Sequence, residues 1–221
     1  MTFVYFLMIV LPISWILLPL TQNRRDWKQR VVWKIFILCA SYIFLGFNQP
    51  TSNIFSLKIP LPCVVLFSST GFNFLVGEAM SRIKTTKSKK LVLIFAITTN
   101  VSMLGYYKYR NFAIDSLNKI FGDTLGFPKL TALVIPIAIS FFTFQAISYL
   151  VDCYRGTIRK ISFLDLAVYL SFFPHLVAGP IVRPMEFVPQ MNGHIDPTKV
   201  DATKALSLIT REKKKKMIIA D

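Results

Sequence analysis

The chain has 221 residues, of which 53% are hydrophobic and only 17% are charged, and its mean hydropathy is +0.51. A soluble domain usually keeps about a quarter of its residues charged, so this composition excludes an ordinary soluble protein and predicts an integral membrane protein. The 26 Lys and Arg residues outnumber the 11 Asp and Glu residues, which gives a net charge of +15. Because the basic residues lie in short runs between long apolar stretches, they are typical of cytoplasmic loops, and we expect no nucleic-acid partner.

The apolar stretches predict an all-α, multi-pass transmembrane protein with about five full spans and a broken or re-entrant sixth segment. The predicted spans are residues 1–20, 31–47, 59–76, 91–107 and 130–151. Lys34, close to one end of the second span, is expected to extend its ammonium group to the membrane surface. The sixth segment, 163–182, is interrupted by Pro174 and by Ala-Gly-Pro at 178–180. Such irregular backbone is tolerated in a membrane only where protein buries it or where it lines a cavity.

The charges of the loops predict the orientation of these spans. Loops 21–30, 78–90 and 152–162 carry four, five and three basic residues, whereas the loop 48–58 carries one. The loop 108–129 carries four, and its side stays ambiguous. Since basic loops are retained in the cytoplasm, the pattern favours three cytoplasmic loops and an N-terminus outside the cell membrane.

Four polar side chains share one face of the fifth predicted span. Gln145, Ser148, Tyr149 and Asp152 follow the spacing i, i+3, i+4 and i+7, which places them on one side of a helix. Lipid offers them no hydrogen-bond partners, so they are expected to face other helices or a polar cavity. Two interpretations remain open: hydrogen bonds between helices, or the lining of a substrate cavity. Gly156 stands where a glycine commonly ends a helix.

His175 is the histidine inside the broken sixth segment. A histidine in a membrane segment is a functional candidate because its pKa lies near neutrality. No carboxylate lies within one helical turn to orient it, so we expect His175 to pack, to form hydrogen bonds or to line a cavity rather than to catalyse. The second histidine, His194, is in a polar segment, and two histidines without an acidic cluster predict no metal site. The three widely spaced cysteines are expected to be buried, free and without a metal.

Two of these stretches resemble a known family. PIAISFFTFQAISYLVDCYRG, residues 136–156, and LDLAVYLSFFPHLVAGPIVRP, residues 164–184, resemble the membrane-bound O-acyltransferases. The resemblance is closest to the bacterial alginate O-acetyltransferases, which are related to the D-alanyl transfer proteins of teichoic-acid modification. GYYKYRNF at 105–112 and KKKKMIIAD at 213–221 add support, while the earlier spans match only in hydropathy.

The resemblance implies an enzyme that O-acetylates a cell-envelope or exported polysaccharide such as alginate. It further implies a bacterial inner (plasma) membrane location and no bound cofactor. The substrate would be a cytoplasmic acyl donor, acetyl-CoA or a similar thioester. An extracytoplasmic partner protein would pass acyl groups to the polysaccharide. Residues 1–221 are then expected to form a single membrane domain, the N-terminal part of a larger fold.

The resemblance also implies that the catalytic histidine of the family lies beyond residue 221. No catalytic residue is therefore assigned here, and the truncated chain is expected to be inactive alone. The candidates for cavity lining are Gln145, Ser148, Tyr149, Asp152 and His175. Two alternatives remain: a transporter or flippase subunit, and a non-catalytic membrane remnant. A transporter predicts an inverted internal repeat, and the sequence contains no recognisable one.

Overall fold

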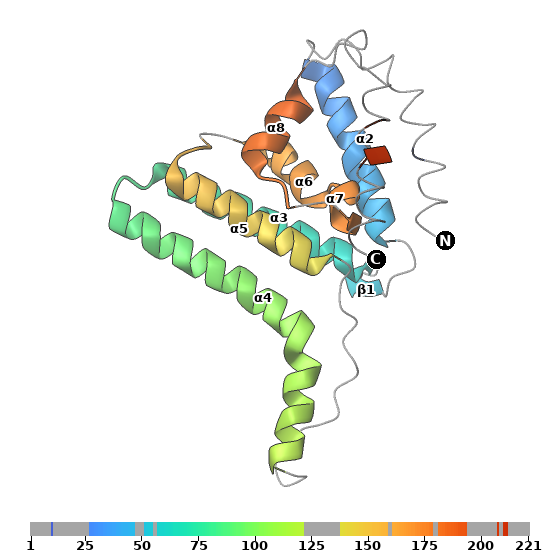
Figure 1. Ribbon diagram of the computed structural model, residues 1–221, viewed down its shortest axis with the longest axis vertical. Coiled ribbons are helices and arrows are strands. Elements are labelled where there is room, and N and C mark those ends of the chain that lie inside the picture. Colours follow the sequence, from blue (N-terminus) through green and yellow to red (C-terminus); the bar gives the residue numbers. More distant parts are fainter. Residues whose placement is uncertain are drawn as a thin grey trace.

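In the computed structural model the described residues form a bundle of helices, with a short β-hairpin between the helices α2 and α3 (Figure 1). The described residues are 10, 27–46, 51–54, 57–121, 138–158, 161–178, 181–193, 207, 210 and 211. Their elements are α2 (Trp27–Gly46), β1 (Thr51–Ile54), β2 (Leu57–Pro60), α3 (Leu61–Arg82), α4 (Thr86–Phe121), α5 (Ile139–Arg155), α6 (Phe163–Ser171), α7 (Phe173–Ala178) and α8 (Pro184–Asn192). Helices α3, α4 and α5 pack against one another, while α2 and α6 pack against each other and against α3.

Three of the described helices are long and apolar enough to cross a membrane: Lys28–Gly46, Leu61–Arg82 and Thr86–Leu117. They coincide with the second, third and fourth predicted spans. Of the first predicted span, 1–20, only Val10 is described. The fifth, 130–151, is represented by the 17 residues of α5, and residues 130–137 lie outside the described part of the chain. The helical, membrane-inserted class is therefore confirmed in outline, while the number of spans stays a prediction.

The link between α2 and α3 is an antiparallel hairpin, which the expectation of an all-α protein did not include. Strand β1 pairs with β2 so that Thr51 lies opposite Pro60 and Ile54 lies opposite Leu57. The predicted third span began at residue 59, but α3 begins at Leu61. A proline in the first turn of α3 explains this start. The N–H groups of the first helical residues have no acceptor within the helix, so proline, which lacks an N–H, loses no hydrogen bond there.

Helices α3 and α4 are longer than the spans that hydropathy predicts. Helix α3 continues to Arg82 and α4 continues to Phe121, past the predicted ends at 76 and 107. The added residues of both helices mix polar with apolar side chains, so both helices continue past the edge of the apolar window. Residues 106–121 contain neither proline nor glycine, so the helix does not stop where the apolar stretch does.

The predicted sixth segment is broken, and the break is at Phe172, two residues before Pro174. Helix α6 ends at Ser171 and α7 begins at Phe173, so the proline lies in the first turn of α7. The backbone N–H of Phe173, freed by the break, donates to the hydroxyl of Ser41 on α2 at 3.3 Å. Irregular backbone is thus satisfied by a neighbouring helix, as a membrane interior requires. Gly179 and Pro180, the second predicted break, lie outside the described residues.

Helix α5 ends as its sequence predicts. Gly156 adopts φ 74°, and its N–H bonds to carbonyls of the last turn of the helix. At the other end Ala138 also has a positive φ, 64°, which is unusual for a residue with a side chain. Both ends of α5 are therefore marked by residues with left-handed backbone conformation.

Candidate functional site

The polar stripe of α5 lies inside the bundle. Gln145, Tyr149 and Asp152 are 1%, 4% and 5% exposed, while Ser148 is partly exposed. Helix α5 packs against α3 and α4 and also contacts α6, α7 and α8, so these side chains face protein on several sides. Two oxygen atoms, Oε1 of Gln145 and Oδ2 of Asp152, are buried without a hydrogen-bond partner among the described residues. Unpaired buried acceptors are costly, and a donor from a ligand or from another part of the protein would relieve that cost.

Ser148 of α5 lies beside Tyr169 of α6. The Tyr169 hydroxyl donates to the backbone carbonyl of Val182 at 2.8 Å. Val182 lies just before α8, so this hydrogen bond links α6 to the start of α8. Both interpretations of Ser148, hydrogen bonds between helices and the lining of a cavity, stay predictions.

Tyr149 fills the space left by a glycine on α3. A Cβ atom built on Gly77 would lie 2.8 Å from Cζ of Tyr149 and closer still to its hydroxyl oxygen. The tyrosine also lines a cavity of about 180 Å³ at the ends of α3 and α5, together with Glu78, Lys89 and Cys153. This small cavity presents a phenol, a thiol, an ammonium and a carboxylate, and Tyr149 is the one residue of the stripe that lines it.

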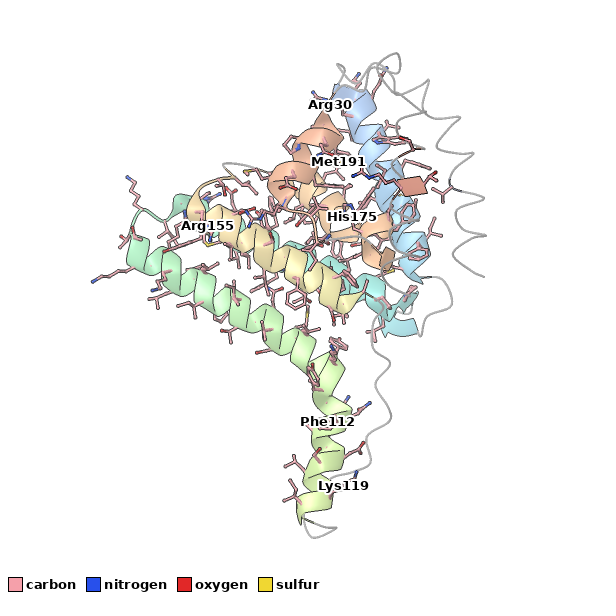
Figure 2. All side chains as sticks on the ribbon, viewed as in Figure 1. Arg30, Phe112, Lys119, Arg155, His175 and Met191 are labelled. Carbon is pink, nitrogen blue, oxygen red and sulfur yellow. The ribbon has the colours of Figure 1, made fainter. Side chains whose placement is uncertain are left out.

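His175 faces a larger groove. A cavity of about 650 Å³ lies between α2, α7 and α8. His175, labelled in Figure 2, is one of the residues that line it. Its other walls include Trp33, Phe36, Ile37, Phe187 and Met191. The imidazole packs edge-on against Phe172 and Phe187, with ring centroids 4.8 and 5.4 Å away. Its Nδ1 is buried and has no hydrogen-bond partner among the described residues.

The five predicted lining residues are therefore not gathered around one cavity. Tyr149 and His175 line two different cavities, and Gln145, Ser148 and Asp152 line neither of them. A substrate-lining role for all five stays a prediction. The described residues contain no group of His, Cys, Asp and Glu side chains that could hold a metal ion. The three cysteines are free, with Cys63 buried, Cys153 partly exposed and Cys39 exposed, against the expectation that all are buried.

An ion pair between Lys34 and Asp165 was not anticipated from the sequence. The expectation that Lys34 reaches the membrane surface is wrong, because its side chain is buried and pairs with Asp165 of α6. Asp165 also accepts from the Ser162 hydroxyl at 2.7 Å, and Ser162 accepts from the Asp165 N–H, which caps α6. A lone lysine in an apolar stretch together with an acid in another could have indicated such a pair.

Two asparagines form a second polar contact that the sequence analysis missed. Asn73 of α3 and Asn100 of α4 exchange side-chain hydrogen bonds of 3.1 and 2.9 Å. Each amide also donates to a carbonyl one turn earlier in its own helix, at 2.8 and 2.9 Å. Both residues are almost fully buried. Each asparagine lies in a predicted span, which is the signal that could have identified them.

Comparison with known proteins relates this helical bundle to bacterial O-acetylases. The chain is 35% identical over 163 residues to the probable alginate O-acetylase AlgI of Pseudomonas aeruginosa, over 72% of this chain and 29% of the relative. The corresponding protein of Azotobacter vinelandii is 34% identical over 162 residues, 72% of this chain and 30% of the relative. The peptidoglycan O-acetyltransferase of Helicobacter pylori is 32% identical over 182 residues, 71% of this chain and 32% of the relative.

These similarities confirm the resemblance seen in the sequence. The chain belongs to the membrane-bound O-acyltransferase family, and its relatives named above include alginate O-acetylases and a peptidoglycan O-acetyltransferase. It spans between 29% and 32% of the length of those relatives. No family model matches the chain, and no solved structure matches it.

Proposed function

We propose that this chain is part of an O-acyltransferase that acetylates an exported or cell-envelope polysaccharide. The observation that carries the proposal is the identity of 35% over 163 residues with an alginate O-acetylase. The buried polar side chains of α5 add support, because a membrane bundle with unpaired acceptors in its interior has the means to bind a polar substrate there.

The physical reason for such an enzyme is the bilayer itself. An activated acyl donor, acetyl-CoA or a similar thioester, is polar and does not cross lipid, while the polysaccharide acceptor is on the other side. A protein that provides a path through the membrane combines delivery of the acyl group with its transfer. An extracytoplasmic partner protein that receives the acyl group and passes it to the polysaccharide belongs to the same proposal.

Gln145, Ser148, Tyr149, Asp152 and His175 are the proposed lining residues. The free oxygen atoms of Gln145 and Asp152 are suited to accept hydrogen bonds from hydroxyl or amide groups of a substrate. None of the five is assigned as the general base, since the resemblance attributes that role to a histidine outside these 221 residues. The chain alone is accordingly proposed to be inactive, as one membrane domain of a bacterial inner-membrane enzyme with its N-terminus outside.

Deletion of the gene that encodes the chain, followed by its restoration, tests the proposal. We expect the deletion to remove ester-linked acetyl groups from an exported or envelope polysaccharide, and restoration to return them. Acetyl groups released by mild alkali report the result. Unchanged ester content together with a failure to export the polysaccharide would contradict the proposal and favour the transporter or flippase alternative.

The same strain tests the proposed inactivity of residues 1–221. Expression of these residues alone is expected to leave the polysaccharide unacetylated, provided that the chain is detected in the membrane fraction. Restored acetylation that His175→Ala then abolishes would show that the catalytic histidine is in this chain after all.

A further inference from the structure

The end of α4 carries an apolar face that no described element covers. Helix α4 has 36 residues, which corresponds to about 54 Å, whereas the hydrocarbon core of a bilayer is about 30 Å thick. Figure 1 shows that the C-terminal part of α4 bends away from the other labelled elements, and Figure 2 labels Phe112 and Lys119 on it. None of the side chains described between Tyr106 and Ile120 is buried. We call residues 108–121 the α4 extension.

The apolar face of the extension continues the lipid-facing side of the same helix. Nine exposed apolar side chains of α4 lie within an arc of about 160° when each residue advances by 100°. They are Leu91, Ile94, Phe95, Val101 and Tyr106 in the part of α4 beside the bundle, and Tyr109, Phe112, Leu117 and Ile120 in the extension. In the first part this side faces away from the buried Ala96 and Asn100, which contact the bundle. It is therefore the side that a bilayer must cover.

One side of the extension is polar. Lys108, Asn111, Asp115 and Lys119 lie within an arc of about 80° when each residue advances by 100°. A helix that simply projected into water would need no apolar face, and one that crossed lipid would need no polar side. One apolar side and one polar side are typical of a helix that lies in the surface of a membrane.

The charges and aromatic rings of the extension agree with this location. Lys108 and Lys119 lie beside the apolar arc, where their alkyl stems can cover lipid while their ammonium groups reach the headgroups. Lys108 also lies 5.4 Å from the ring of Tyr109, and Arg110 lies 5.4 Å from the ring of Tyr106. Tyrosines with basic neighbours are characteristic of the membrane–water boundary.

We propose that the α4 extension lies in the bilayer surface, on the side opposite the loop at 83–85, with Tyr109, Phe112 and Ile120 inserted among the lipids. The partner is the lipid surface itself, with anionic headgroups near Lys108 and Lys119. The extension thereby anchors the bundle at this membrane face and fixes the direction in which the chain leaves α4.

Depth-dependent quenching tests the proposal in the full chain, reconstituted in vesicles of phosphatidylethanolamine and phosphatidylglycerol. Cys39, Cys63 and Cys153 are first replaced, because all three are free thiols. An environment-sensitive fluorophore is then attached to one new cysteine at a time. Positions 112 and 120 sample the apolar side, and positions 111 and 115 are matched controls on the polar side.

We expect labels at 112 and 120 to be quenched by a lipid-attached quencher at a depth of about 5–10 Å and to be shielded from iodide in water. Labels at 111 and 115 should show the reverse. If the labels at 112 and 120 are shielded from both quenchers, a protein surface covers the extension and the proposal fails. If iodide reaches all four positions equally, the extension projects into water, which also overturns it.

Discussion

The contact between Asn73 and Asn100 places two buried amide groups between two helices that are long and apolar enough to cross a membrane. Each amide has its hydrogen-bond partner on the other helix and a second one in its own helix. Interhelical hydrogen bonds in membranes average about 0.6 kcal/mol, so the pair contributes more by fixing the register of α3 against α4 than by its energy.

Substitution of these asparagines should be strongly non-additive. We expect Asn73→Leu or Asn100→Leu alone to lower the free energy of unfolding by about 1–3 kcal/mol, because each leaves a buried amide without its partner. The double variant should lose clearly less than the sum of the two, with a coupling of about 0.5–3 kcal/mol. Unfolding in mixed micelles measures all three values, and strict additivity would contradict the paired geometry.

Gly77 shows how one missing side chain permits a close approach of helices. We expect Gly77→Ala to destabilise the protein by about 1–3 kcal/mol, because the new methyl group overlaps the ring of Tyr149. Gly71→Ala is a matched control on the same helix, since nothing lies within 4 Å of its Cβ position. The control should be neutral or slightly stabilising. In a Tyr149→Ala background Gly77→Ala should cost little, and an unchanged penalty there would refute the contact.

At the scale of the elements, the ion pair between Lys34 and Asp165 joins α2 to the broken segment. Removal of one partner from a buried pair typically costs about 3–5 kcal/mol, because the other charge stays buried without compensation. We expect Lys34→Met to show a loss of this size in thermal unfolding of the purified protein. Lys34→Met combined with Asp165→Asn should recover most of it, since no unpaired charge is left.

An exposed pair would behave differently. Arg82 and Glu78 form an ion pair of 3.1 Å on the surface of α3, and this pair serves as the control. Replacement of either residue should change stability by less than about 1 kcal/mol. If Lys34→Met were as mild as Arg82→Met, the Lys34 side chain would not be buried with its partner as described.

The sequence was informative about elements and less informative about contacts. Apolar stretches located three of the spans, Pro174 indicated the break, and Gly156 marked the end of α5. The ends of α3 and α4 were placed too early because hydropathy reports the lipid boundary, whereas a helix can continue beyond that boundary. The hairpin between α2 and α3 was not predicted, because pairing of β1 with β2 depends on register, which an apolar pattern of this length does not specify.

The candidate site was only partly predictable for a related physical reason. Helical periodicity placed Gln145, Tyr149 and Asp152 on one buried face. The burial of Lys34 depends on Asp165, 131 positions further along the chain, and no local pattern connects them. The same holds for Gly77 and Tyr149, whose complementarity exists only after α3 and α5 have packed.

At the scale of the whole molecule, the orientation in the membrane follows from the basic loops. We predict that Thr85, in the loop between α3 and α4, is in the cytoplasm and that the N-terminus is outside. A cysteine at residue 85 should resist a membrane-impermeant thiol reagent in intact cells and react after permeabilisation. Reaction in intact cells would reverse the orientation, and the extension of α4 would then lie at the cytoplasmic surface.

Transfer of an acyl group across the membrane tests the central claim most directly. Membrane vesicles that contain the full protein receive a thioester with a labelled acetyl group on the cytoplasmic face only, and the polysaccharide is on the opposite face. The account predicts alkali-labile label on the polysaccharide, which is lost when the protein is absent. Label that stays on the donor side, while the polysaccharide moves across the membrane unlabelled, would contradict it.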